Sequence, residues 1–303
     1  MEFGRVLNPD NILHQLPPDH MLTGQVLQQY VPLNAIDIQN NIFVGCPVWT
    51  HQAWKGRIFP PQTPQKEFLK QYALQFNTIE LNATHYKIPT REQILKWAEQ
   101  TPPHFLFCPK IPQSISHYKQ LNGVDELNEF FCNAVAHFEQ KLGLSFLQLS
   151  DRFSPSRLDL IHQYVDKFPK GIPLAVELRH KDWFEETQIV KDFFDFMVQK
   201  NVSTIITDTS GCRYALGMRL TTPVAAIRFL ANDRHSSDFQ RLDDWTERLK
   251  TWFEQGLQRL YFWVHDYENT YAPDLADYFI QKLNLLLGIS LKRPFFYSQQ
   301  SLF

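Results

Sequence analysis

Short apolar runs rich in β-branched and aromatic residues alternate along this sequence with longer amphipathic stretches, from residue 42 to residue 288. Eight such runs occur: IFVG (42–45), NTIEL (77–81), HFLFCPK (104–110), LSFLQLS (144–150), IPLAVEL (172–178), STIITD (203–208), AAIRFL (225–230) and LYFWVH (260–265). In most of the intervening stretches, apolar residues recur every three or four positions, which is typical of helices. This alternation predicts an α/β fold with parallel strands.

Eight strand and helix units favour a (β/α)8 TIM-type barrel, whose usual size of about 250 residues matches residues 42–288. The sixth helix is expected to be short or irregular, because residues 209–223 leave no room for a full exterior helix. An open doubly wound sheet shares the alternation, but the first turn lacks the G-x-G-x-x-G pattern. Residues 1–41 are predicted to form an N-terminal extension, and residues 289–303 a C-terminal tail.

The charge and composition exclude several classes of protein. The formal net charge is -2 over 303 residues, so no overall basic field indicates binding to nucleic acid or to an anionic membrane. The first twenty residues are mixed polar, unlike a signal peptide, and no apolar run approaches the ~20 residues of a membrane span. The four cysteines are widely spaced, without a CxxC pair. We therefore expect reduced thiols and a cytoplasmic location.

Polar side chains collect at the ends of the apolar runs, where a (β/α)8 barrel carries its working groups. Glu80 and Asn82 have the same parity, so both side chains are expected to point into the mouth of the barrel. Ionised groups in apolar strands are costly unless they are paired or hydrated. The other strands end in a similar way, with Lys110, Glu177, Arg179, Asp208, Arg228 and His265.

These charges have two interpretations. They are either a functional site or a structural layer of ion pairs, such as Glu177 with Arg228 or Glu80 with Arg179. We favour the functional site for the whole ring, because a purely structural layer is filled at lower cost by apolar residues.

Several long segments resemble the YecE-like family, a domain of unknown function (domain of unknown function 72). They are VGCPVWTHQAWKGRIFP, FNTIELNATHY, KWAEQTPPHFLFCPKIPQSISH, AVELRHKDWF and the eighth strand followed by YAPDLA, and they span roughly residues 42 to 285. The resemblance implies a (β/α)8 barrel but no established reaction. It also implies that the family's recurring pocket positions are here Trp49, Trp54, Lys55, Glu80, Asn82, Thr84, Tyr86, Lys110, His117, Glu177, Arg179, Trp183, Asp208 and Arg228.

The chain departs from the family pattern on two sides of the predicted mouth. The usual GTSGW is GCPVW here, and His85 replaces the aromatic residue before the family tyrosine. The seventh and eighth strands run into FLANDR and WVHDYEN, where a His-Gly pair and adjacent asparagines are usual. The ligand of typical members is therefore not carried over to this chain.

The mixture of cations and carboxylates at the strand ends best suits a small anionic compound, phosphorylated or carboxylated. We expect an enzyme of the hydrolase, lyase or isomerase type, with Glu80 as proton carrier and with Glu177, Asp208 and Tyr86 as further catalytic groups. No cofactor is predicted. The expected ligand-binding residues are Trp49, Trp54, Lys55, Asn82, Thr84, Lys110, His117, Arg179, Trp183, Arg228 and His265.

Other chemistries remain as alternatives. Glu80 and Glu177 suit the acid and base of a glycosidase, although the nearby cations are unusual for a neutral sugar. A divalent metal held by Glu80, Glu177, Asp208 and His265 lacks any HxH or HExxH pattern in support. A cysteine nucleophile at Cys46 or Cys108 has no evident base. A non-catalytic barrel that binds a ligand or nucleic acid also remains open, and the oligomeric state is not predicted.

Overall fold

The structure is a computed structural model that describes residues 4, 6, 8–10 and 12–297. Strands form at all eight predicted runs, and every strand pair is parallel, which confirms the α/β fold. The strands are β1 (Ile42–Gly45), β2 (Thr78–Leu81), β3 (Leu106–Pro109), β4 (Ser145–Gln148), β5 (Leu174–Glu177), β6 (Ser203–Asp208), β7 (Val224–Leu230) and β8 (Arg259–His265).

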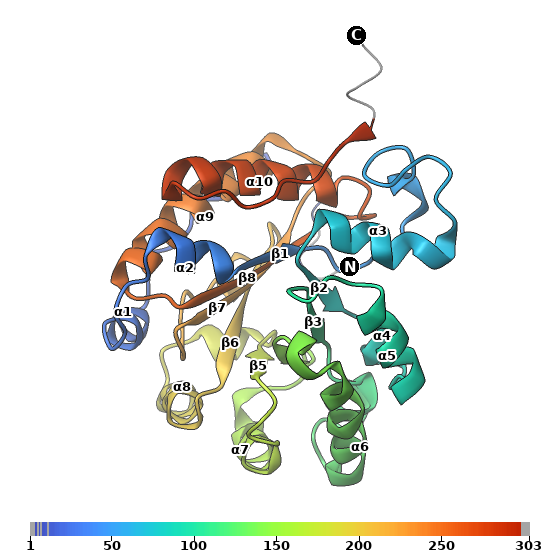
Figure 1. The fold of residues 1–303 in the computed structure, drawn as a ribbon. Helices are drawn as coiled ribbons and strands as arrows, with labels where there is room; N and C mark the ends of the chain where they lie inside the picture. The colour runs from blue at the N-terminus through green and yellow to red at the C-terminus, as the bar shows by residue number, and fades with distance from the viewer. Residues whose placement is uncertain (1–3, 5, 7, 11, 298–303) are drawn as a thin grey trace.

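The α-helices lie around the strands, and the strands occupy the centre of the molecule (Figure 1). They are α1 (Met21–Leu27), α2 (Ala35–Asn40), α3 (Phe68–Gln75), α4 (Ala83–Tyr86), α5 (Arg91–Glu99), α6 (Asp125–Val135), α7 (Leu158–Lys167), α8 (Gln188–Lys200), α9 (Ser236–Gln255) and α10 (Ala272–Leu287). Short 3₁₀ helices are η1 (Gln52–Trp54), η2 (Gln65–Glu67), η4 (Ala136–Lys141), η5 (Pro155–Arg157), η6 (Lys181–Phe184) and η7 (Arg213–Ala215), and η3 (Ser114–Tyr118) is a π-helix.

The helix ends follow simple capping rules. Thr90 caps α5 by accepting a hydrogen bond from Gln93 N. Gly256 and Gly288 end α9 and α10 in the left-handed conformation, as glycine does without steric cost.

Six strands form one sheet in the order β1-β8-β7-β6-β5-β4, and β2 pairs with β3 in a second sheet. The two sheets are hydrogen-bonded to each other at both edges of the smaller one. On one side, Glu80 N of β2 donates to Cys46 O, directly after β1, at 3.3 Å. On the other side, Ile111 N, after β3, donates to Phe146 O of β4 at 2.9 Å.

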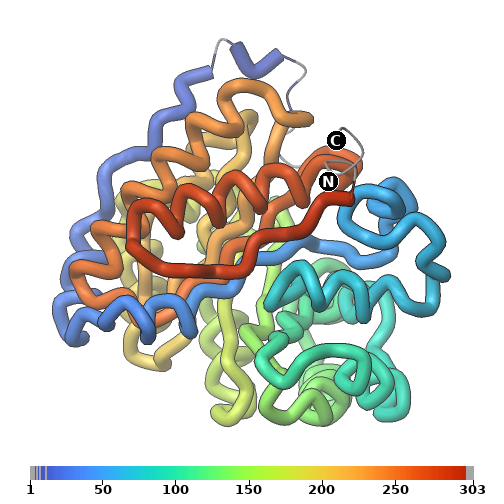
Figure 2. The backbone as a smooth tube through the Cα atoms, turned by 45° about the horizontal axis from the view of Figure 1, so that its top comes forward, coloured from blue at the N-terminus to red at the C-terminus, as the bar shows by residue number. Residues whose placement is uncertain are grey.

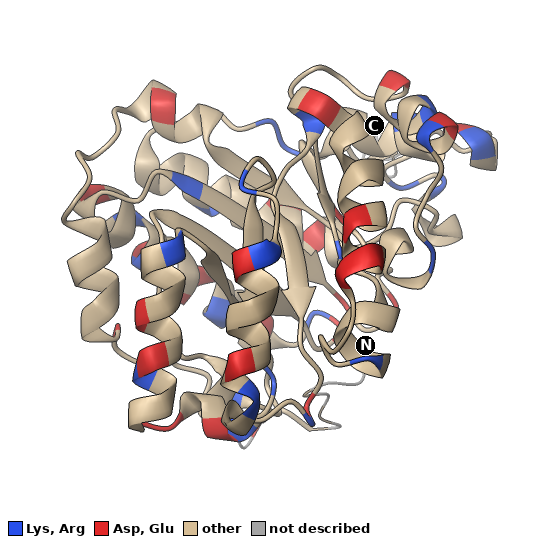
Figure 3. Cartoon of the chain, turned by 90° about the horizontal axis from the view of Figure 1, so that it is seen from below, with Lys and Arg blue, Asp and Glu red and all other residues tan. Residues whose placement is uncertain are grey.

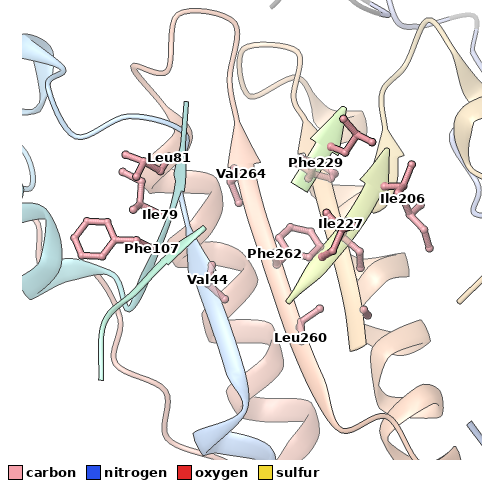
Figure 4. Packing of buried hydrophobic residues seen from close by; sticks show 14 of the residues in the cluster. Val44, Ile79, Leu81, Phe107, Ile206, Ile227, Phe229, Leu260, Phe262 and Val264 are labelled. Carbon is pink, nitrogen blue, oxygen red and sulfur yellow. The ribbon is translucent and has the colours of Figure 1, made fainter. Parts of the chain in front are cut away.

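The buried apolar residues divide into two clusters according to strand parity. The larger cluster packs one face of the strands against the helices, as Val44, Ile79, Ile227 and Phe262 illustrate (Figure 4). The smaller cluster lies on the opposite face and takes side chains from most of the strands. It consists of Phe43, Cys108, Leu144, Phe146, Ala175, Ile205, Ala226, Tyr261 and Trp263.

The sixth unit lacks a full helix, as the short segment 209–223 predicts: of the helices, only η7 lies between β6 and β7. Helix α1 from the N-terminal part of the chain packs beside this unit: Thr23 Oγ1 donates to Met218 O at 2.8 Å and accepts from Leu220 N at 2.9 Å. Figure 1 places α1 on the outside near α8 and α9. The N-terminal segment therefore covers the place that a full sixth helix would otherwise occupy.

The chain after α10 runs back toward α3, as the end of the tube in Figure 2 shows. Phe295 N donates to Gln75 Oε1 at 2.8 Å, and Tyr297 N donates to Arg57 O at 2.7 Å. The rest of the predicted tail, residues 298–303, and residues 1–3, 5, 7 and 11 of the extension lie outside the described residues. The division into extension, barrel domain and tail stays a prediction. No helix in the described part of the chain has the length and apolar character needed to cross a membrane.

Gly45 tests the close contact between β1 and β2. A Cβ atom at this position would lie 2.1 Å from Thr78 O and 2.9 Å from the Tyr72 hydroxyl, so a side chain would force backbone apart. We expect Gly45→Ala to lower the free energy of unfolding, measured with urea, by about 3 kcal/mol. Gly24→Ala, within α1 and with no atom near its Cβ, should raise it by about 0.5–1 kcal/mol. Equal stability of the two variants would contradict the close approach of these strands.

Candidate functional site

A layer of polar side chains lies directly beyond the smaller apolar cluster, on the same face of the strands. Six members each follow a residue of the smaller cluster on the same strand by two positions, so the strand period of two places them on its face. The seventh, Glu80, stands beside the cluster residue Cys108 in the register of β2 and β3. We call this the polar layer. Its members are Glu80 of β2, Lys110 after β3, Gln148 of β4, Glu177 of β5, Thr207 of β6, Arg228 of β7 and His265 of β8. All seven are buried.

Arg228 lies at the centre of the polar layer, between two buried carboxylates. Its Nε and Nη2 donate to the two oxygens of Glu80 at 2.9 and 2.8 Å. Its Nη1 donates to both oxygens of Glu177, at 3.0 and 2.9 Å. All three side chains have no exposed area. The layer is therefore built around one guanidinium that neutralises part of the charge of two glutamates.

Glu177 is surrounded by further donors. Gln148 Nε2 donates to it at 2.8 Å, Thr207 Oγ1 at 3.0 Å and Arg179 Nε at 3.1 Å. Burial acts to raise the pKa of Glu177, but Arg228, Arg179 and Lys110 outweigh it and lower that pKa to about 2. Glu177 is thus a carboxylate at any ordinary pH.

Glu80 is held in the same state by its own neighbours. Asn82 Nδ2 donates to Glu80 Oε1 at 2.9 Å, and His265 Nε2 lies 2.7 Å from Glu80 Oε2. Burial acts to raise the pKa of Glu80, yet the charge of Arg228 and the hydrogen bond with His265 bring it well below its usual range. Burial also lowers the pKa of His265, although the charge of Glu80 acts to raise it. The His265 ring is therefore neutral, and its Nε2–H donates a hydrogen bond to Glu80.

Lys110 is the member of the layer whose protonation state changes near neutral pH. Its Nζ donates to Gln148 Oε1, a neutral acceptor, at 2.9 Å. Burial and the positive charge of Arg228 lower the pKa of Lys110 to about 7, although Glu80 and Glu177 act to raise it. The amine is therefore close to half protonated at neutral pH.

Two histidines lie close to Lys110. His85 Nδ1 is 2.8 Å from Ile111 O, and the His85 and His117 rings make an edge contact at 5.1 Å between centroids. Burial and then the Lys110 charge lower the pKa of His85 to about 4, and the same two effects lower the pKa of His117. Both rings are consequently neutral near pH 7.

Asp208, which the sequence placed with the other strand-end carboxylates, lies on the opposite face of β6. It binds Arg241 Nη1 at 2.9 Å and Trp245 Nε1 at 2.8 Å, both from α9, and it also pairs with Arg213. The reason is parity, because Glu177 stands beside Ile205 in the register and Thr207 shares that face. Asp208 thus links β6 to helix α9, which packs against it.

Three tryptophans predicted to bind a ligand instead pack against other residues. Trp54 and Trp183 are fully buried in the larger apolar cluster, and their ring nitrogens donate to Asn269 O at 2.8 Å and to Phe153 O at 2.7 Å. Trp49 contacts the Trp97 ring edge-on at 5.5 Å. Large aromatic side chains release most free energy when buried, which explains these positions.

Three further predicted residues lie outside the layer. Thr84 Oγ1 bonds to Leu81 O and Lys110 O, at 2.8 and 2.7 Å, and so links β2 to the end of β3. Lys55 is exposed, and Tyr86 is 74% exposed beside His85. Tyr86 therefore faces solvent, and its proposed role as a catalytic donor stays a prediction.

Two members of the layer, Gln148 and Thr207, were absent from the predicted site. Counting parity from the smaller apolar cluster would have found both, since Phe146 precedes Gln148 by two residues and Ile205 precedes Thr207 by two. Of the two ion pairs proposed from the sequence, Glu177 with Arg228 is present, and Glu80 also binds Arg228.

No group of three or more metal-binding side chains is arranged for a metal ion among the described residues. Acidic and basic residues are interspersed along the helices visible in Figure 3. The arrangement thus offers a buried site in which a lysine and two guanidiniums surround two carboxylates that both already bind Arg228.

The sequence matches the model of a family described as "Protein of unknown function DUF72" over residues 43–294. It is 27% identical over 280 residues to UPF0759 protein YecE of Escherichia coli K12, which covers 86% of this chain and all of that protein. UPF0759 protein YunF of Bacillus subtilis is 26% identical over 150 residues. This alignment covers 47% of this chain and 52% of the YunF protein.

Two crystal structures of DUF72 family proteins have a similar fold. The one from Thermotoga maritima superposes with a TM-score of 0.63 at 22% identity, covering 81% of this chain and 99% of that chain. The one from Enterococcus faecalis superposes with a TM-score of 0.62 at 19% identity, covering 82% of this chain and 98% of that chain. At these identities the likeness concerns the fold alone.

Replacing Arg228 tests the central ion triad. Arg228→Met should lower the free energy of unfolding by about 3–5 kcal/mol at pH 8, because two buried carboxylates lose their counter-charge. The loss should shrink toward pH 5, since burial then raises both pKa values and protonation relieves the repulsion. Wild-type protein should behave oppositely: its glutamate pKa values are lowered in the folded state, so this stability is present above pH ~4.5 and falls toward pH ~2.

The control is Arg228→Met combined with Glu80→Gln and Glu177→Gln, which removes the charges together. It should recover part of the lost stability and show little dependence on pH between 5 and 8. A loss for Arg228→Met alone that is the same at pH 5 and pH 8 would contradict this account of the triad.

Proposed function

The chain belongs to the DUF72 family of proteins of unknown function, and from this premise we propose that it is a (β/α)8 barrel whose polar layer binds and converts a small anionic compound. The anion carries a carboxylate or phosphate group. Lys110, with Arg179 beside it, is the proposed anion-binding part of the layer.

The proposed barrel is supported by how the strands meet. Parallel strands alternate with helices, and the smaller sheet is hydrogen-bonded at both edges to the outer strands of the larger sheet. Such barrels carry their sites at the carboxyl ends of the strands. Glu80, Gln148, Glu177 and His265 all stand at or within one residue of those ends.

The surroundings of the buried Lys110 amine are the observation that carries the proposed ligand class. Its ammonium is buried, bonded to a neutral amide and close to two guanidiniums, which makes the site costly to charge. A bound carboxylate or phosphate would supply the missing counter-charge and form charge-assisted hydrogen bonds. The gain from such an anion is larger in a buried site than in water.

Glu80 and Glu177 fit a supporting role better than the proton-carrying role expected from the sequence. The neighbours of both carboxylates hold their pKa values below the usual range, so neither group is a ready acid, and both are weak bases. The same property argues against the glycosidase alternative, which needs one protonated carboxyl group. We assign the two glutamates to positioning Arg228 and Arg179, and we assign proton transfer to Lys110.

Calorimetry with small anions tests this proposal. Inorganic phosphate and L-lactate are the probes, each titrated in two buffers of different ionisation enthalpy at pH 8. We expect binding to be accompanied by proton uptake, because the anion raises the pKa of Lys110 above its free value of about 7. The dissociation constant should rise by about tenfold for each pH unit above 7, until the pKa of the complex is reached.

Lys110→Met should abolish the proton uptake and weaken binding, whereas Lys119→Met should bind like the wild type. Lys119 is an exposed lysine nine residues further along the chain and serves as the matched control. Binding of neither anion, or binding that is unchanged in Lys110→Met, would contradict the proposed site.

A further inference from the structure

We propose that Lys110 is a nucleophile that forms an imine with a small carbonyl compound carrying a carboxylate group, such as an α-keto acid. This inference rests on the proposed anion site and names its substrate class. It assigns to the lysine nitrogen a covalent role in addition to its charge.

The hydrogen bonding of Lys110 leaves its nitrogen able to react. Gln148 donates its Nε2 to Glu177, which turns the amide oxygen toward Lys110 Nζ. Both carboxylates of the layer are held by Arg228. A neutral amide oxygen accepts one N–H of Lys110 but does not fix a positive charge on it, so the lone pair of the neutral amine stays available.

The surrounding charges favour this neutral form. Burial and Arg228 lower the pKa of Lys110 to about 7, whereas an ordinary lysine is almost wholly protonated at that pH. Lysines desolvated beside another cationic group are a recognised kind of activated nucleophile. A salt bridge to a carboxylate at the same place would have kept the amine protonated and unreactive.

The site also suits the two ends of an α-keto acid. The Arg179 guanidinium, whose side chain is 12% exposed, donates to Glu177, and its positive charge contributes to lowering the pKa of Lys110. A carboxylate attracted to Arg179 leaves the adjacent carbonyl carbon for attack by the lysine nitrogen. In this arrangement Lys110 in its ammonium form supports a simple anion, and in its neutral form it attacks a carbonyl.

The covalent step balances without an external oxidant or reductant. The Lys110 lone pair forms a C–N bond to the carbonyl carbon, and the carbonyl π electrons move to oxygen, which takes up a proton. The resulting carbinolamine loses its oxygen as water while the nitrogen lone pair forms the C=N bond. In sum, one neutral amine, one carbonyl group and one proton give a protonated imine and one water. Neutral His117 is the nearby group that we assign to moving the proton from nitrogen to oxygen.

Trapping with borohydride tests the inference on the full chain. Wild-type protein is incubated with pyruvate at pH 7.5 and treated with sodium borohydride, which delivers hydride to the imine carbon and leaves a stable secondary amine. Intact-mass measurement should show one adduct per chain, and peptide mapping should place it on Lys110. The adduct should form at least tenfold faster than on exposed lysines, and inorganic phosphate should slow it by competing for the anion site.

Two variants of Lys110 distinguish the reactivity of its nitrogen from its positive charge. Lys110→Arg keeps a cation but lacks the reactive amine, so it should still bind L-lactate and should give no adduct. Lys110→Met should lose both properties, and Lys119→Met should react like the wild type. Hydroxyacetone, a ketone without an anionic group, should label the wild type at least tenfold less than pyruvate does.

The outcomes distinguish this inference from the proposed function. Anion binding with proton uptake but no adduct on Lys110 would overturn the imine and leave the anion site standing. If the protein shows no anion binding and no adduct, both the imine and the anion site are overturned. Because the phosphate competition uses wild-type protein, a variant that fails to fold does not decide the result. An adduct spread over exposed lysines, unaffected by phosphate, also counts against the inference.

Discussion

The polar layer at the carboxyl ends of the strands depends on one interaction, in which one buried guanidinium binds two buried carboxylates. Arg228 reaches Glu80 on β2 and Glu177 on β5, so it joins the two-stranded sheet to the middle of the six-stranded one. A buried carboxylate without a partner costs several kcal/mol, so the burial of both glutamates depends on Arg228. The neighbouring amide, hydroxyl and imidazole groups complete the hydrogen bonds of the carboxylates and fix the orientation of the triad.

This triad determines which group in the layer can change its charge. Because both glutamates are committed to Arg228, they stay ionised and contribute fixed negative charge. Lys110 stands at the edge of the triad, where repulsion from Arg228 and burial act in the same direction on its proton. The layer thus has a fixed ionic centre and one group, Lys110, whose charge changes near neutral pH.

The sequence predicted the strands well, and it singled out five of the seven residues that form the polar layer; the physical reasons differ between residues. The eight apolar runs are strong signals, and Glu80, Glu177, Arg228, Lys110 and His265 are unusual enough at strand ends to stand out. Asp208 was grouped with them because a sequence displays strand ends more clearly than strand faces. Trp54 and Trp183 were misplaced because an aromatic residue near a predicted mouth serves equally well in a core, and only the packing of η1 and η6 decides between the two.

The covering of the short sixth unit by α1 has a consequence for the order in which the chain folds. Residues 14 and 23 contact residues 213 and 218, about two hundred positions later, and Asp19 pairs with Arg248 and with Trp252 of α9. Contacts of such long sequence separation form slowly, because the loop between them must close first. Helix α1 is made long before the residues that it contacts, and it is therefore among the last elements to pack in place. The outer surface of the sixth unit stays open to water until α1 has packed there.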